Sequence, residues 1–248
     1  MVVQLICNKK PCTIELRVKC SSERELFIIG YDPGDRYSVF FKRLMYPKVG
    51  ESTFYFGMPQ APSNLKVVLY DNQTRQFTNS KTFEVVSLKK IPLRTAPTGA
   101  GKKTREYIIF IQEFCLKLPL LQPNLTYADD KKQFQIDLFP LNLEYATPAR
   151  IEKTRNFIEV SKTDFLQMTI PQRIIILLHE YAHNFINRDQ DSEVEADVNA
   201  LKIYLGLGYP FIEGMYAFTH ILHDSEMNIE RLQIIEKYMV KHKLYIDK

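Results

Sequence analysis

Two histidines and a glutamate near residue 180 form the arrangement in this sequence that is best suited to chemistry. The segment His179-Glu180-Tyr181-Ala182-His183 is an HExxH pattern, and composition alone predicts about 0.007 such matches in a chain of 248 residues. On a helix, a spacing of four residues places both imidazoles on one face, about one turn apart, where they can share a tetrahedral metal ion. Glu180 is offset from that row, in the position of a general base that reaches a metal-activated water.

A catalytic zinc ion takes three protein ligands and leaves a fourth position for water, so the two histidines need a partner. Ile186 and Asp189 stand where an extended HExxH motif would have Gly and His, which leaves Asp189 as a remote candidate. Glu193 and Asp197 lie four apart on the next predicted helix and share a face. We predict Glu193 as the third ligand and Asp197 as the acceptor for a ligand imidazole N–H. The alternative is that Glu193 is only an acid in a first helical turn, where the helix dipole favours it.

The other acid of this segment, Glu195, has a structural interpretation. Helical geometry turns it roughly 160–200° away from the face of Glu193 and Asp197. Together with Ser192 it matches a capping box, in which the two side chains satisfy free backbone groups at a helix start.

A hydrolytic metal site also needs a donor for the negative charge that develops on the attacked oxygen. The candidates all follow the second motif helix, and they are Tyr209, Tyr216, His220 and His223. His220 and His223 lie three apart and could face the site together. They could equally be surface histidines at a helix end.

HEYAH followed by Glu193-x-x-Ala196-Asp197 resembles the gluzincin metallopeptidases, and it looks like their compact ImmA/IrrE-like or minigluzincin-like domains. The resemblance covers residues 157–210 and implies a zincin fold with zinc held by His, His and Glu. The nine-residue gap before Glu193 is shorter than in most relatives. The resemblance also implies that the strand at 156–161 forms a cleft edge for extended peptide. More loosely, the run from His179 is similar to predicted peptidases encoded beside structural genes in tailed phages that infect Bacteroidetes.

The flanking sequence indicates the elements that position these residues, and it predicts an α+β protein. Apolar and polar residues alternate in seven short segments before residue 93, which is typical of an antiparallel, Ig-like β-sandwich. These segments are Val2–Cys7, Thr13–Lys19, Glu25–Ile29, Tyr37–Lys42, Ser52–Phe56, Leu65–Tyr70 and Thr82–Leu88.

Later segments change to helical periodicity, interrupted by two strands. The predicted helices are 107–118, 171–187, 192–205, 211–223 and 226–243, and the predicted strands are 133–139 and 156–161. We therefore predict a docking domain over 1–93, a linker rich in Pro and Gly over 94–105, and a zincin-like metallopeptidase domain over 106–248, with a small sheet and an active-site helix.

Charge and composition limit the possible partners and location. Residues 1–94 carry 15 Lys and Arg against 8 Asp and Glu, so an acidic protein partner or a larger assembly could bind there; the alternative is a solvated surface. The basic residues are scattered, and no nucleic-acid motif accompanies them. No apolar run is long enough for a membrane helix, and Met1–Cys7 lacks the form of a secretory signal. These features predict a cytoplasmic protein with no membrane or nucleic-acid partner. Association with a virion is the alternative location.

Together these features predict a zinc-dependent peptidase with one Zn²⁺ per chain, acting on a peptide or protein substrate. The alternative is a structural or assembly component, conceivably of a phage virion, that retains a zincin fold and uses its β-domain as a docking module. A scaffold has no need of Glu180, and its presence favours catalysis.

Overall fold

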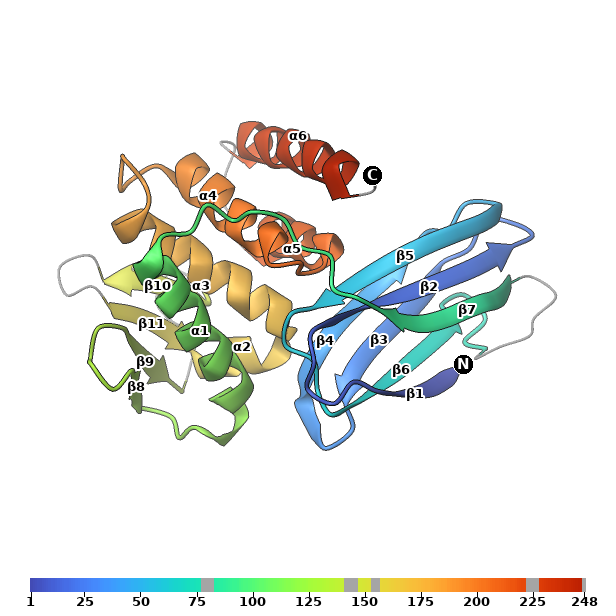
Figure 1. The fold of residues 1–248 in the computed structure, drawn as a ribbon, viewed down its shortest axis with the longest axis horizontal. Helices are drawn as coiled ribbons and strands as arrows, with labels where there is room; N and C mark the ends of the chain where they lie inside the picture. The colour runs from blue at the N-terminus through green and yellow to red at the C-terminus, as the bar shows by residue number, and fades with distance from the viewer. Residues whose placement is uncertain (77–82, 141–146, 153–156, 222–227, 247–248) are drawn as a thin grey trace. The chain divides into compact units, whose positions relative to one another are not determined.

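The computed structural model confirms the α+β class and divides the chain into two compact units. It describes residues 1–76, 83–140, 147–152, 157–221 and 228–246 (Figure 1). The N-terminal unit comprises residues 1–94 together with 208–213, and the C-terminal unit comprises 95–207 and 214–248. Each unit is described separately below. No helix among the described residues is both long and apolar enough to cross a membrane.

Two antiparallel sheets build the N-terminal unit, as the alternating pattern predicts. The four-stranded sheet has the order β1-β6-β3-β4, with β1 at Val2–Ile6, β6 at Asn64–Asp71, β3 at Leu26–Asp32 and β4 at Asp35–Met45. The three-stranded sheet has the order β5-β2-β7, with β5 at Gly50–Met58, β2 at Cys12–Cys20 and β7 at Phe83–Ile91. All seven predicted strands are present.

The core of this unit lies between its two sheets. Ile14, Leu16 and Val18 alternate along β2 and are fully buried, which is the period-2 pattern of a half-buried strand. Phe41 of β4 stacks on Phe56 of β5, with ring centroids 4.4 Å apart, and so joins the two sheets. The four cysteines of the chain are all buried and reduced.

The segment at 208–213 packs in the N-terminal unit although it follows most of the C-terminal unit in sequence. The buried carboxylate of Glu213 accepts a hydrogen bond from the backbone N–H of Lys42 (2.9 Å) and pairs with Arg43 (2.7 Å). A Cβ built on Gly57 would lie 1.8 Å from the carbonyl oxygen of Gly208. The backbone of β5 therefore approaches this segment as closely as only a glycine permits.

We expect Gly57→Ala to lower the free energy of unfolding of the N-terminal unit by about 3 kcal/mol, because the clash is with backbone and cannot be relieved by a rotamer change. Urea unfolding measures this loss. Gly101→Ala, in the C-terminal unit, is the comparison variant, since a Cβ there meets nothing within 4 Å, and it should change the unfolding of the N-terminal unit by less than about 0.5 kcal/mol. Equal stabilities for the two variants would contradict the close approach.

A small mixed sheet and several helices build the C-terminal unit. The sheet order is β10-β11-β9-β8, with β10 at Ala149–Glu152, β11 at Phe157–Ser161, β9 at Gln135–Phe139 and β8 at Thr126–Ala128. Only the β11–β9 pair is parallel. The helices are α1 (Lys102–Lys117), a 3-10 turn (Leu118–Leu120), α2 (Lys162–Gln167), α3 (Ile170–Phe185), α4 (Glu193–Gly206), α5 (Phe211–Tyr216), a π-helical turn (Ala217–Ile221) and α6 (Asn228–Ile246). Residues 211–213 at the start of α5 belong to the N-terminal unit.

Several elements differ from their predicted bounds. Helix α1 begins at Lys102, inside the predicted linker, and the helix expected at 211–223 gives way to a π-helical turn after Tyr216. Strands β8 and β10 and helix α2 were missed because three to six residues are too few for a clear period. The strand at 156–161 was expected at a sheet edge. It appears as β11, which lies inside the sheet between β10 and β9, so β10 forms that edge.

Candidate metal centre

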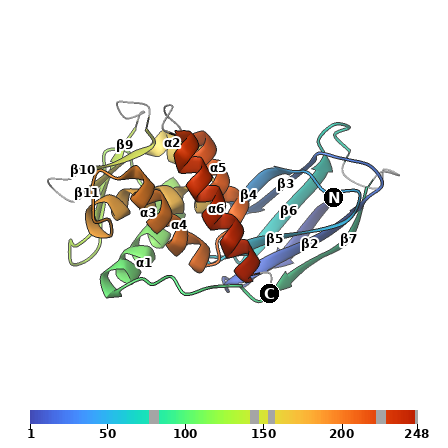
Figure 2. The same ribbon diagram turned by 90° about the horizontal axis from the view of Figure 1, so that it is seen from above.

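Helix α3 carries the HExxH segment in the interior of the C-terminal unit. The Thr169 hydroxyl and the Gln172 side chain form a capping box at its start, and Pro171 occupies the first turn, where a missing N–H costs nothing. Every residue from Ile170 to His183 is buried. The helix packs against α1, β10 and α4, which is why it can be apolar nearly all round (Figure 2).

Contacts of Tyr107 and Arg173 fix the position of α3 against α1 and α2. The Tyr107 hydroxyl donates to the carbonyl oxygen of Leu177 (2.9 Å), and the Tyr107 ring stacks on Tyr181 at 3.9 Å. The buried guanidinium of Arg173 donates to the carbonyl oxygens of Phe165 (2.7 Å) and Cys115 (3.0 Å), which are the ends of α2 and α1. The helix that bears the histidines is therefore held rigidly along its length.

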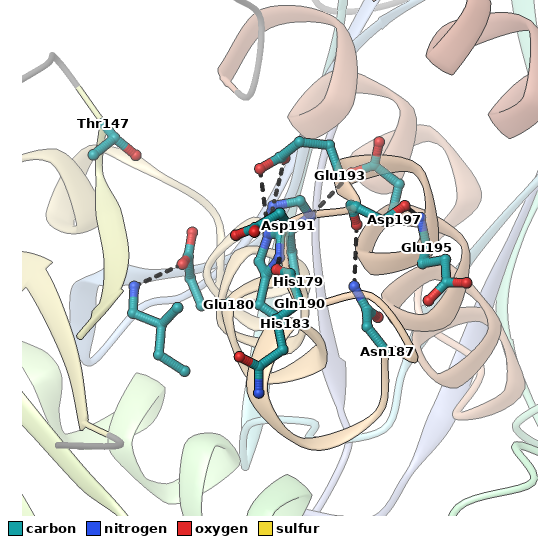
Figure 3. Close-up of polar contacts among 12 residues, drawn as sticks. Thr147, His179, Glu180, His183, Asn187, Gln190, Asp191, Glu193, Glu195 and Asp197 are labelled. Carbon is teal, nitrogen blue, oxygen red and sulfur yellow. Dashed lines mark hydrogen bonds and ion pairs between the residues drawn. The ribbon is translucent and has the colours of Figure 1, made fainter. Parts of the chain in front are cut away.

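The two histidines direct the same ring nitrogen toward a common point. Their Nε2 atoms lie 3.2 Å apart (Figure 3). Two nitrogens bound to one tetrahedral ion at 2.0–2.1 Å would lie about 3.3–3.4 Å apart. The observed separation of the two Nε2 atoms is thus close to the one that a shared metal ion requires.

Glu193 completes this cluster from the first position of α4. The Ser192 hydroxyl caps that helix by accepting from the backbone N–H of Glu195 (3.2 Å). Glu193 Oε2 lies 3.3 Å from His179 Nε2, and its Oε1 lies 3.5 Å from His183 Nε2. One ligand atom from each of the three residues lies within 4.8 Å of the other two. The structure therefore brings together the three side chains that the sequence nominates as metal ligands.

The outer nitrogen of each imidazole lies near an oxygen atom, which leaves the inner nitrogens as donors of lone pairs; the approach of His179 Nδ1 to Asp197 is an ion-pair contact whose angle falls outside hydrogen-bond geometry. His183 Nδ1 lies 2.8 Å from the carbonyl oxygen of Gln190, and His179 Nδ1 lies 2.9 Å from Asp197 Oδ1. Contacts of this kind orient metal-ligating histidines and fix their tautomer. Asp197 lies beside the imidazole for which it was predicted as acceptor, whereas the carbonyl of Gln190 belongs to a loop that no motif marks.

The carboxylates around His179 favour its protonated form. Burial lowers the pKa of the His179 imidazole, but the carboxylates of Asp197 and Glu193 raise it by more, to about 10. The hydrogen bond from His179, together with the nearby positive charges, lowers the pKa of Glu193 to about 2. Glu193 is therefore an anion at any ordinary pH, and a metal ion that binds would displace the proton on His179.

Glu180 lies outside the ligand cluster, toward the sheet. Its side chain is almost fully buried, at 8% exposure. Its Oε2 accepts a hydrogen bond from the backbone N–H of Ile151 in β10 (2.8 Å, Figure 3). Because β10 is the last strand of the described sheet and the N–H of Ile151 donates to Glu180, this N–H points away from β11, toward the edge of the sheet. That edge therefore orients the carboxylate.

Glu195 only partly follows its predicted role. The Ser192 half of the capping box is present, but the Glu195 carboxylate accepts from the backbone N–H groups of Arg188 (2.8 Å) and Asp189 (3.4 Å) instead of Ser192. The N–H of Ser192 donates to the carbonyl oxygen of Asp189 and is already satisfied. The Asp189 carboxylate accepts from the N–H of Asp191, and Asp189 is not in the cluster.

Three of the four candidates for an oxyanion donor lie among the described residues, and each has contacts with residues outside the cluster. The Tyr209 hydroxyl donates to Gln60 Oε1 (3.0 Å), and both residues belong to the N-terminal unit. The ring of Tyr216 stacks on His220, with centroids 4.3 Å apart, and His220 Nδ1 lies 2.7 Å from the Thr219 hydroxyl. His223 lies outside the described residues.

Arg231 is the residue of this site that the motifs missed. Its guanidinium pairs with both oxygens of Asp197, and it lies 3.3 Å from Glu193 Oε2. It stands 34 residues beyond Asp197 on α6, so no short spacing announces it. The one available signal is that a buried Asp in a motif helix needs a cation somewhere in the chain.

Comparisons with known proteins leave this chain without an assigned family. No protein-family model matches it, and a search of the curated proteins finds no significant match. The interpretation of the site therefore rests on its own chemistry. Two imidazole nitrogens and one carboxylate oxygen are a donor set that could hold a metal ion.

Proposed function

We propose that the protein is a zinc-dependent peptidase of the gluzincin type, with His179, His183 and Glu193 as the zinc ligands. The observation that carries the proposal is the 3.2 Å approach of the two Nε2 atoms, with the Glu193 carboxylate beside both. Without a metal ion, one of these two nitrogens must carry a hydrogen and donate it to the other, whereas a metal ion would accept the lone pairs of both. A bound zinc ion would polarise a substrate carbonyl and lower the pKa of a water molecule in its fourth position.

Glu180 is the general base in this proposal. It accepts a proton from the attacking water and then delivers it to the leaving amine. Its hydrogen bond to Ile151 holds one carboxylate oxygen, so the other oxygen is oriented relative to the sheet edge. Its near-complete burial removes competing water from the carboxylate and strengthens its interaction with a nearby proton donor.

Strand β10 is the element that we propose as the platform for the substrate. It pairs with β11 on one side, and it carries the N–H that binds Glu180 on the other. An extended peptide lying along this edge would place its backbone beside the general base. The resemblance implies this role for residues 156–161. We propose residues 149–152 instead, because β10 and not β11 is at the end of the sheet.

Zinc content per chain tests the ligand set. After dialysis against a mild chelator, elemental analysis should find about one zinc per wild-type chain. Glu193→Ala should bind zinc at least about 100-fold more weakly, since the lost group is the only anionic ligand. Glu195→Ala is the matched control, because that carboxylate lies on the same helix and accepts from the backbone N–H groups of Arg188 and Asp189 instead of joining the cluster. Zinc retained equally by both variants, or absent from the wild type, would refute the ligand set.

A further inference from the structure

The guanidinium of Arg231 binds the buried carboxylate of Asp197 through two atoms. Arg231 Nε lies 2.8 Å from Asp197 Oδ2, and Arg231 Nη2 lies 3.0 Å from Asp197 Oδ1. The Asp197 side chain is 1% exposed and that of Arg231 is 15% exposed. A two-point contact fixes the plane of the carboxylate as well as its position, and little water is present to compete with it.

The orientation of Asp197 decides the orientation of a metal ligand. Its Oδ1 lies 2.9 Å from His179 Nδ1, so this carboxylate lies between the guanidinium and the imidazole. If Asp197 rotated, the His179 ring would lose the contact that directs Nε2 toward the cluster. Arg231 therefore acts on His179 without touching it.

The same guanidinium also restrains the third candidate ligand. Arg231 lies 3.3 Å from Glu193 Oε2, and the Glu193 side chain is 48% exposed. A half-exposed glutamate at a helix start has several accessible rotamers, and fixing one of them costs conformational entropy. The contact with Arg231 holds Glu193 near the histidines before a metal ion arrives.

Arg231 lies in the first turn of α6, and this helix packs on α4 (Figure 2). One turn later on the same face, Ile235 is buried. Among the described residues, the ion pairs that link α6 to α4 are those of Arg231 with Glu193 and Asp197. The C-terminal helix is thus fastened at the metal centre.

We propose that Arg231 is a positioning residue of the metal site, and that zinc binding and the docking of helix α6 therefore strengthen each other. The inference rests on the zinc site of the proposed function and adds a regulatory element to it. Reciprocity follows from thermodynamic linkage, since any factor by which docked α6 tightens zinc binding is the factor by which zinc tightens α6.

The charge of Arg231 acts in the opposite direction, because a guanidinium repels a nearby cation. The two effects predict opposite signs for a neutral substitution. If repulsion dominated, Arg231→Met would bind zinc more tightly. If positioning dominates, as we propose, the variant binds zinc more weakly, because Asp197 and Glu193 lose their common partner and their fixed orientations.

The test is the zinc dissociation constant, measured by competition with a chromophoric chelator on the full chain. We expect Arg231→Met to weaken binding about 10–100-fold, as the loss of outer partners of a metal site commonly does. Arg231→Lys should fall between this variant and the wild type, because a lysine keeps the charge but cannot bind a carboxylate at two points. Lys237→Met, at an exposed position of the same helix, should match the wild type.

A second readout follows α6 itself and does not depend on catalysis. Zinc should slow the hydrogen exchange of α6 backbone amides in the wild type and in Lys237→Met, and should slow it much less in Arg231→Met. If Arg231→Met fails to fold, Arg231→Lys carries both comparisons. The inference would be overturned if Arg231→Met bound zinc as tightly as the wild type, or more tightly. It would also be overturned if zinc did not change the hydrogen exchange of α6 in the wild type.

The outcomes also separate this inference from the proposed function. If the wild-type protein binds zinc but hydrolyses no peptide, the proposed peptidase function is wrong, and the zinc dissociation constants still test the role of Arg231. If Arg231→Met binds zinc with unchanged affinity and still hydrolyses peptide, the role of Arg231 is refuted and the peptidase function stands. A wild-type protein that binds no zinc would overturn both.

Discussion

Glu180→Gln should abolish peptide hydrolysis while the protein still binds one zinc ion per chain. The amide has the shape of the carboxylate, and its oxygen can still accept the hydrogen bond from the N–H of Ile151. It cannot accept a proton from the attacking water. Removal of a general base costs about 10²–10⁴-fold in rate. We expect a fall in kcat of that size with little change in KM.

The measurement is a turnover assay on a peptide library, paired with zinc analysis of the same samples. Glu195→Gln is the control, because it changes the same functional group at a position outside the ligand cluster. Hydrolysis that survives in Glu180→Gln at the wild-type rate would show that another group is the base. If the wild type binds zinc and cleaves nothing, and Glu180→Gln has no phenotype, the scaffold alternative becomes the better hypothesis.

His183→Ala should lose high-affinity zinc binding and, with it, the stabilisation that zinc gives to the folded chain. The substitution removes one of two imidazole ligands and leaves the carbonyl of Gln190 without the ring that it contacts. We expect zinc affinity to fall at least about 100-fold. A ligand at 100 times its dissociation constant stabilises a protein by about 2.7 kcal/mol, so the loss should be visible in thermal unfolding.

Thermal unfolding with and without added zinc measures this effect. The wild type should show a zinc-dependent rise in melting temperature, and His183→Ala should show none. His220→Ala is the control, since that ring stacks on Tyr216 and is not one of the candidate ligands. Its zinc-dependent rise should equal that of the wild type. A normal rise in His183→Ala would mean that the zinc ion binds elsewhere.

The parts of this structure that follow from local periodicity are the parts that could be predicted. The alternation along β2 and the four-residue spacing of His179 and His183 each restate a backbone repeat, and both appear as expected. The pairing of Glu193 with the two histidines was also accessible, because the shared face of Glu193 and Asp197 follows from helix geometry.

What could not be predicted depends on contacts between distant parts of the chain. The Glu180–Ile151 bond spans 29 residues and uses a backbone N–H, which no side-chain pattern can mark. The Arg231–Asp197 pair spans 34 residues between two helices. Position after α4 makes Tyr209 a candidate oxyanion donor in the sequence, but it says nothing of the unit to which Tyr209 belongs. The chain has by then entered the N-terminal unit, where the Tyr209 hydroxyl donates to Gln60.

The membership of residues 208–213 in the N-terminal unit has a consequence for how the chain can acquire its structure. During synthesis, residues 1–94 emerge first, but the partner of Lys42 and Arg43 emerges about 170 residues later. Until then the nascent β-sandwich lacks Glu213 and the backbone that fills the space beside Gly57. The N-terminal unit can complete its fold only after residues 208–213 have been synthesised, which is after helix α4 with Glu193. The folding of the two units therefore overlaps in time.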